Sequence, residues 1–135
     1  MTGGNDSLLK VWKLWTKGKK VAQMESIKTL SGHGGSIMSV KFAQNGRIFV
    51  STSGDKTLRM WHAANLVCLR VLEGHGRYVN CGVFNPEGDL LVTGSNDRSF
   101  NVWQLSGALC SSDIDLRPTS AVVSIFLSLI EETST

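Results

Sequence analysis

Two sets of side chains in this sequence have the composition of a hydrolytic triad. Each set has a hydroxyl group that could attack a substrate, a histidine that could act as base, and a carboxylate that could orient the histidine. The second set follows the first at a distance of 42 residues, and the members are Ser51, His33 and Asp55, then Thr93, His75 and Asp97. A hydrolase would also need an exposed nucleophile within reach of its base, and donors for an oxyanion.

Three features of these sets argue against hydrolysis. The set occurs twice, whereas an enzyme needs one site. Ser51 lies within the stretch 49–53, FVSTS, and not on the strained Gly-x-Ser-x-Gly turn that exposes a nucleophilic serine. A tryptophan also closes each set, Trp61 in the first and Trp103 in the second. We therefore expect no enzyme, and labelling of Ser51 by a fluorophosphonate probe would contradict this expectation.

The two sets are parts of a longer internal repeat. The stretches 32–61 and 74–103 both open on Gly-His and close on Trp, and their landmarks stay 42 residues apart. The matched pairs are His33 and His75, Phe42 and Phe84, Gly46 and Gly88, Asp55 and Asp97, and Trp61 and Trp103. A fixed period of this length indicates a repeat architecture, in which each unit needs neighbours to bury its faces.

The N-terminal residues carry the second half of a third copy. Thr2, Asp6 and Trp12 are spaced four and then six residues apart, as their counterparts are in the other two copies. No histidine precedes them in the sequence. We therefore expect the sequence to begin inside a repeat, two strands into it.

Short apolar runs separated by turn residues predict strands within each repeat. In the first whole repeat we expect a four-stranded meander, and in the second its first three strands; the four stretches are 36–42, 47–53, 57–61 and 66–72. The apolar residues Ile37, Val40 and Phe42 are spaced three and then two apart, which predicts a β-bulge. Gly82 replaces the apolar residue expected at its position, so it should pack less well.

Residues 13–20, KLWTKGKK, predict a basic, solvated loop between the first two copies. The connection from Trp12 to His33 is 21 residues long, against 14 in the next copy, so it carries an insertion of seven. A mixed polar and apolar strand over 21–30 is expected to follow the loop. Four lysines in eight residues are common in loops. A nuclear-import or nucleic-acid patch is therefore the less favoured interpretation, and it would require steeply salt-dependent association.

The composition fits a globular protein and disfavours several functional classes. Hydrophobic residues make up 41% of the 135 residues, and the net charge is only +3. This mild charge does not indicate nucleic acid as the main partner, because phosphate binding needs a concentrated basic face. The N-terminal residues show no signal pattern, and the longest apolar stretch, 121–130, is too short to span a bilayer.

The cysteines do not form a recognisable framework. Cys68, Cys81 and Cys110 are odd in number and widely spaced, and they form no Cys-x-x-Cys pair. A zinc site and a set of disulfides are therefore not expected, and the sequence predicts no metal or cofactor. A reducing, cytoplasmic compartment is expected, with the nucleus as the alternative.

The repeat landmarks resemble those of the WD-repeat β-propeller family: Gly-His, then a central Asp, then a terminal Trp-Asp. The terminal Asp is absent here, since the copies end Trp12-Lys13, Trp61-His62 and Trp103-Gln104. The resemblance implies an all-β fold, a partial β-propeller of four-stranded antiparallel blades. It divides the chain into a partial blade (inner strands missing, with the basic loop and an outer strand), a complete blade, a second blade and a divergent tail, over 1–31, 32–73, 74–110 and 111–135.

The resemblance also implies a structural hydrogen-bond network in each blade. Asp bonds His, His bonds Ser or Thr, and the hydroxyl bonds the indole N–H of Trp. Such a network satisfies buried polar groups and fixes the register of the strands. Its expected members are His33, Ser51, Asp55 and Trp61, then His75, Thr93, Asp97 and Trp103. In the N-terminal copy Thr2, Asp6 and Trp12 lack their His, so that network is expected to be incomplete.

Propellers of this family bind partners through one narrow face, at the loop before the first strand and the tight turn before the central Asp. Carried over by position, the resemblance predicts a non-catalytic surface for other proteins, whose residues are Ser36, Met38 and Gly54, then Arg77, Tyr78, Asn80 and Asn96, and Asn5 in the partial blade. Arg77 and Tyr78 are the preferred contact anchors, because Arg and Tyr are enriched at binding hot spots. The small neighbours Ser36 and Gly54 should leave a recess beside Tyr78.

Three stretches resemble the last blades of the WD-repeat proteins that also carry SAM and U-box domains: 29–33, 53–61 and 93–104. That resemblance implies substrate recognition for a ubiquitin ligase. Nothing after Gln104 resembles a SAM or U-box domain, so this chain alone is not expected to ligate ubiquitin. A closed ring needs about four to eight blades. We therefore expect a truncated isoform, a piece of a longer protein or, least favoured, several copies that assemble into one ring.

Overall fold

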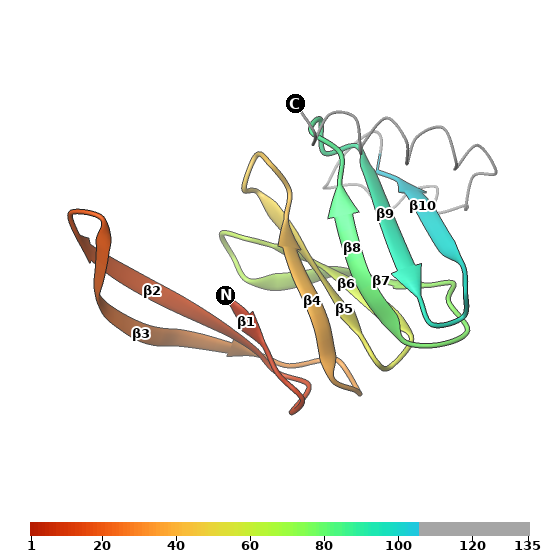
Figure 1. Ribbon diagram of the computed structural model, residues 1–135, viewed down its shortest axis with the longest axis horizontal. Coiled ribbons are helices and arrows are strands. Elements are labelled where there is room, and N and C mark those ends of the chain that lie inside the picture. The colour runs from red at the N-terminus through yellow and green to blue at the C-terminus, as the bar shows by residue number, and fades with distance from the viewer. Residues whose placement is uncertain (106–135) are drawn as a thin grey trace.

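The computed structural model describes residues 1–105, which form ten strands in three antiparallel sheets and no helix (Figure 1). The sheets follow one another along the chain, and each strand pairs with its neighbour in sequence. The sheets are stacked face to face, as successive blades of a propeller are. The predicted all-β fold of a partial β-propeller is therefore confirmed.

The N-terminal sheet has the order β1-β2-β3, with β1 at Thr2–Gly3, β2 at Leu9–Lys17 and β3 at Lys20–Leu30. The prediction of a basic loop over 13–20 is wrong. Only Gly18 and Lys19 form the turn, because β2 continues through Lys17 and pairs with β3 up to the Lys17–Lys20 pair. The seven-residue insertion therefore lengthens a hairpin of two paired strands.

The middle sheet is complete, with the order β4-β5-β6-β7. Its strands match the predicted ranges to within one residue at each end, and they are β4 at Ile37–Phe42, β5 at Ile48–Ser53, β6 at Thr57–His62 and β7 at Val67–Glu73. The register of β4 against β5 shifts between Ile37 and Ser39, which confirms the predicted bulge. The bulge turns Met38 out of the ladder, where it is exposed.

The last sheet comprises β8 at Val79–Phe84, β9 at Leu90–Ser95 and β10 at Phe100–Gln104, and it repeats the bulge between Val79 and Cys81. Gly82 does not pack loosely, contrary to the prediction. It is buried, and a Cβ on it would lie 3.4 Å from Thr52 Cγ2 of the middle sheet. The glycine therefore allows β8 to approach β5. The end of the second predicted blade, 106–110, and the divergent tail, 111–135, lie outside the described residues.

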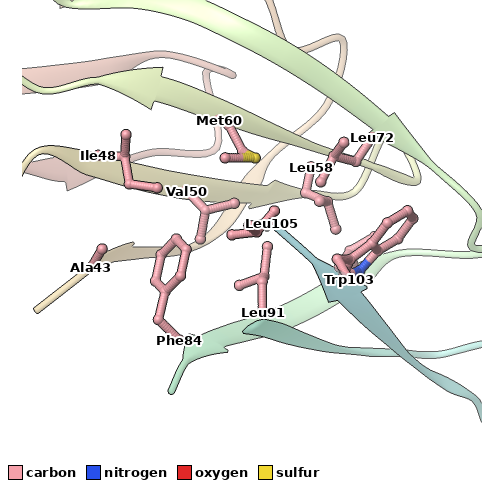
Figure 2. Packing of buried hydrophobic residues seen from close by; sticks show 11 residues of the cluster. Ala43, Ile48, Val50, Leu58, Met60, Leu72, Phe84, Leu91, Trp103 and Leu105 are labelled. Atoms are coloured by element: carbon pink, nitrogen blue, oxygen red, sulfur yellow. The ribbon is translucent and has the colours of Figure 1, made fainter. Parts of the chain in front are cut away.

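The main core lies between the middle and last sheets, and Figure 2 shows their side chains pointing toward one another. All six residues of β5 are buried, since both faces of the middle sheet are covered. Ile48 and Val50 face the last sheet, and Phe49 faces the N-terminal sheet. The eleven buried residues of this core are Ala43, Ile48, Val50, Leu58, Met60, Leu72, Val79, Phe84, Leu91, Trp103 and Leu105.

A smaller core joins the N-terminal sheet to the middle sheet. Its five buried members are Leu9, Leu30, Ile37, Phe49 and Trp61. In the N-terminal sheet the two residues of β1 stand where the middle sheet has the six-residue strand β5, and no strand corresponds to β4. Phe42 is consequently 50% exposed, whereas its counterpart Phe84 is buried at 9% against the middle sheet.

Candidate protein-recognition surface

The predicted residues of the middle sheet form one connected hydrogen-bond network. His33 lies in the loop before β4, with Nδ1 2.9 Å from Asp55 Oδ2 and Nε2 2.7 Å from Ser51 Oγ. The indole N–H of Trp61 donates to the same hydroxyl oxygen at 2.9 Å. The network therefore ties the loop before β4 to β5, to the β5–β6 turn and to β6.

The last sheet has the same network with threonine in place of serine. His75 Nδ1 lies 3.0 Å from Asp97 Oδ2, and Nε2 lies 2.9 Å from Thr93 Oγ1. The indole N–H of Trp103 donates to Thr93 Oγ1 at 2.9 Å. The two networks are therefore the same arrangement in consecutive sheets.

Each aspartate of the two networks accepts further bonds, both from the turn that it begins and from the loop that carries its histidine. The backbone N–H of Gly34 donates to Asp55 Oδ2, and the Thr57 hydroxyl donates to Oδ1 at 2.7 Å. Partial burial raises the pKa of Asp55, but these bonds and the bond from His33 outweigh it and hold the pKa well below its usual range. For Asp97 the bond from the Ser99 hydroxyl is the main cause of a lowered pKa. Both carboxylates are ionised at neutral pH.

Burial lowers the pKa of His33, even though the neighbouring Asp55 favours the charged form. A neutral imidazole has one N–H, and the ionised carboxylate can only accept. We therefore assign the proton to Nδ1, which donates to Asp55, so that Nε2 accepts the Ser51 hydroxyl proton. Ser51 is fully buried, and Trp61 already donates to its oxygen. No substrate can reach this hydroxyl, so the triad-like set cannot perform hydrolysis in this fold.

The N-terminal copy keeps only part of the network. Trp12 Nε1 donates to Thr2 Oγ1 at 2.8 Å, as in the other two sheets, but the bond is exposed. Asp6 Oδ1 accepts only the backbone N–H of Leu8, at 3.2 Å. Leu8 occupies the position of Thr57 in the middle sheet, so this copy lacks a supporting hydroxyl as well as its histidine.

The predicted partner-binding residues gather at the rim where β5 ends and β8 begins. Tyr78 is 53% exposed and lies across Gly54, where a Cβ would be 3.8 Å from its ring. The ring therefore lies close to Gly54, one of the two small residues that were expected to leave a recess beside Tyr78. A shallow hollow of ≈ 380 Å³ lies beside it, lined by Lys56, Gly76, Arg77, Tyr78 and Asn96.

Other predicted residues border this rim without lining the hollow. Asn80 donates to the side-chain oxygen of Asn96 at 2.6 Å, which fixes both amides. Ser36 and Met38 stand at the start of the bulged strand β4. Asn5 is exposed, and it follows Gly4, whose carbonyl accepts the N–H of Ile37 at 3.0 Å. The turn of the N-terminal sheet is therefore joined to the same end of the middle sheet.

The family model described as WD domain, G-beta repeat matches residues 24–62 and 66–104, which is more than half of the chain. The chain belongs to the WD40-repeat family. WD40 repeats are generally non-catalytic and serve as scaffolds for protein interaction. A similar curated protein is p21-activated protein kinase-interacting protein 1-like from Danio rerio, which is 34% identical over 64 residues. That match covers 46% of this chain and only 15% of the relative.

The WD40 repeats of the sequence are offset from the sheets of the structure. The first match begins inside β3, the outer strand of the N-terminal sheet, and ends with β6. The second begins just before β7 and ends with β10. Each repeat therefore supplies the outer strand of one sheet and three strands of the next, which links adjacent sheets covalently as well as by packing.

Sequence reasoning missed several residues that the structure places at the networks and the rim. Thr57 and Ser99 support the two aspartates, and Lys56 lines the hollow beside Tyr78. Lys56 and Arg98 occupy equivalent turn positions with φ of 73° and 67°. The 42-residue period could have revealed all of these, because each has its counterpart in the other WD40 repeat.

Residues 1–105 contain no group of three His, Cys, Asp or Glu side chains placed to hold a metal ion. His62, which stands where the family has its terminal Asp, is half-buried and accepts the backbone N–H of Asn65 on Nδ1 at 3.3 Å. Over the same residues, no helix is long and apolar enough to cross a membrane.

Proposed function

We propose that this chain is a non-catalytic recognition segment that binds another protein through the rim around Tyr78. The observation that carries the proposal is the tyrosine itself, which is 53% exposed and lies close to Gly54 of the preceding sheet. A tyrosine side chain has few rotatable bonds, so it loses little conformational entropy when a partner covers it. The Asn80–Asn96 bond gives the rim a fixed polar feature.

The charges around the rim support a partner with acidic residues. Lys56 and Arg77 border the hollow beside Tyr78, and Arg98 borders an adjoining hollow that also includes Arg77. Asp55 and Asp97 are the acidic residues nearby. Their carboxylates already accept bonds, Asp55 from Gly34 and His33 and Asp97 from Gly76 and His75. The proposed contact surface extends to Ser36, Met38, Gly54 and Asn5 at the same end of the neighbouring sheets.

A paired alanine experiment tests this proposal. The variant Arg77→Ala/Tyr78→Ala removes the cation and the aromatic ring, and Arg47→Ala/Val67→Ala removes a cation and an exposed apolar side chain from the opposite ends of the strands. Proteins captured from a cell lysate by the unaltered chain should be lost with the first variant and retained with the second. Equal capture by the unaltered chain and the first variant would sink the proposal.

A more specific candidate is substrate recognition for a U-box ubiquitin ligase. It is supported by the resemblance of 29–33, 53–61 and 93–104 to the last blades of such proteins. If it is correct, ubiquitination of the captured proteins should fall when the rim variant replaces the unaltered chain. Unchanged ubiquitination of proteins that bind at the rim would reject the ligase role and leave the binding role standing.

The cellular compartment belongs to the same proposal. Cys68 and Cys81 are exposed free thiols. Exposed thiols persist in a reducing environment, which supports a cytoplasmic or nuclear location. Fluorescence microscopy of the tagged full-length chain tests this, and secretion into the medium would contradict it.

A further inference from the structure

The longest hairpin of the molecule serves neither the networks nor the rim. It comprises residues 11–28 of β2 and β3, which we call the ribbon, and Figure 1 shows it extending away from the other two sheets. Residues 14–24 stand where the corresponding hairpin of the middle sheet has only 63–66. The additional length buries no further core, because every residue from 13 to 29 is exposed.

The ribbon has two chemically different faces. Directly paired residues share a face, and Leu14 lies opposite Met24, while Thr16 lies opposite Val21. The three apolar side chains of this face are 53%, 58% and 59% exposed. The other face carries Lys13, Trp15, Lys17 and Lys20, with Glu25 opposite Lys13, and the Lys13 ammonium lies 5.1 Å from the centre of the Trp15 ring.

The ribbon also accounts for the net positive charge of the protein. It contains five lysines and one glutamate, a net charge of +4, so the remaining residues sum to −1 in a chain of net charge +3. Within residues 1–105, none of the ribbon lysines lies within salt-bridge distance of a carboxylate. These ammonium groups are therefore available to an acidic partner at no cost in internal ion pairs.

Both edges of the ribbon expose backbone hydrogen-bonding groups. Among the described strands, β3 pairs only with β2 along its 11 residues. On the other side, β1 pairs only with Leu9 and Lys10, so none of the strands within residues 1–105 lies beside β2 from Val11 onward. Open edges of this kind accept an added strand from another chain.

We propose that the ribbon is a second docking surface, which binds an extended acidic segment of another protein as an added β-strand. A segment that alternates acidic and apolar residues would match all three features, since its side chains alternate between the lysine face and the apolar face. Immersion in a lipid bilayer is disfavoured, because it would leave the edge groups without partners. Duplex DNA is disfavoured, because phosphates offer nothing to the apolar face of Leu14, Val21 and Met24.

The probe for this proposal is the synthetic peptide acetyl-(Glu-Val)5-amide, added to the full chain while binding is measured by isothermal titration calorimetry. Lys17→Glu/Lys20→Glu should weaken peptide binding by about tenfold or more, because it reverses two charges of the lysine face. Lys41→Glu/Arg47→Glu makes the same change of charge on exposed residues of the middle sheet, and it should leave binding within about twofold. Far-UV circular dichroism confirms that both variants are folded.

Three further measurements distinguish an added β-strand from DNA or lipid as the partner, and the ribbon proposal from the rim proposal. A peptide with every backbone amide N-methylated should not bind, because it has no N–H group with which to form the ladder. Arg77→Ala/Tyr78→Ala should leave peptide binding unchanged, so failure at the rim and failure at the ribbon are distinguishable. Equal binding of the methylated peptide, equal effects of the two charge variants, or tighter binding to duplex DNA or to phosphatidylserine vesicles would each overturn the proposal.

Discussion

The N-terminal and middle sheets carry the same hydroxyl, Asp and Trp landmarks in the same spacing, yet the hydroxyl and the Trp are buried only in the middle sheet. In the middle sheet Ser51 is fully buried and Trp61 is 3% exposed, whereas Thr2 is exposed and Trp12 is half-buried in the N-terminal sheet. The Trp–hydroxyl bond has the same length to within 0.1 Å in both, at 2.9 and 2.8 Å. The residue pair therefore forms its bond in either place, but the environment of that bond differs.

The difference shows what a WD40 network needs beyond its own residues. The middle sheet has a packed neighbour on each face, and its histidine loop closes over the end of β5. Within the described residues, the N-terminal sheet has one packed neighbour, no histidine and Leu8 in place of the supporting hydroxyl. A polar network contributes most where water is excluded, since its members have no alternative partners there.

The largest expected effect is a contrast between the two tryptophans at the same repeat position. Trp61→Ala should cost about 3–5 kcal/mol of unfolding free energy, because it opens a cavity beside Phe49 and leaves the buried Ser51 hydroxyl without its donor. Trp12→Ala should cost about 1 kcal/mol or less, because water replaces much of what is lost. Urea denaturation followed by far-UV circular dichroism measures both, and equal costs would break the comparison.

The hydroxyl groups give a sharper test with smaller changes in volume. Ser51→Ala leaves the Trp61 indole N–H and His33 Nε2 unsatisfied in a buried site, so it should cost about 1–3 kcal/mol. Thr2→Ala exposes its partner to water and should cost less than about 0.5 kcal/mol. The same urea titration applies. A Thr2→Ala cost as large as that of Ser51→Ala would mean that burial does not set the value of the bond.

Gly82 tests whether the last sheet packs as closely on the middle sheet as the distances indicate. Gly82→Val should cost about 1–3 kcal/mol, because its methyl groups would press on Thr52 and Thr93. Gly82→Ala should be within about 1 kcal/mol of the unaltered chain, since its Cβ meets ordinary contact distances of 3.4 Å. If valine stabilised the protein, the interface would be loose, as the sequence had suggested.

The smallest expected effect is a dependence of the chain's stability on pH. It comes from His33 of the middle sheet, which has no counterpart in the N-terminal sheet. The pKa of His33 is lower in the folded chain than the ordinary 6.5, so below that pH the unfolded chain binds more protons. Its neutral, buried state therefore makes stability fall as pH falls below 6.5. In His33→Gln this component is lost, and the stability gap between the two chains should narrow between about pH 7 and pH 5.

The assay for this prediction is the urea midpoint of both chains across that pH range. Asp55 and Asp97 do not interfere, because their lowered pKa values keep them ionised there; their contribution is lost only as pH falls through and below 3.8. A gap that stayed constant or widened toward acid would contradict the assigned neutral state of His33.

Much of the fold was predictable from the sequence because its signals are local and repeated. Turn residues and apolar alternation located the four strands of the middle sheet to within one residue, and the three-then-two spacing of Ile37, Val40 and Phe42 located the bulge. The prediction of a loop over 13–20 was wrong, whereas a strand was expected over 21–30, which includes the other half of the ribbon. Lysines surround the adjacent Leu14 and Trp15 in 13–20, so no alternation is evident there, and pairing with β3 makes 13–17 part of a strand.

The sequence by itself determined which residues meet in each blade, because the landmarks lie at fixed distances along strands whose pairing the turns dictate. Only the tertiary structure determined how much each of these contacts stabilises the protein. Thr2 and Ser51 hold equivalent positions, but the stacking of sheets leaves one in water and removes the other from it. The sequence suggested that Gly82 weakens packing, whereas in the structure it allows β8 to approach Thr52 closely. Burial depends on neighbours distant in the sequence, and local spacing does not contain that information.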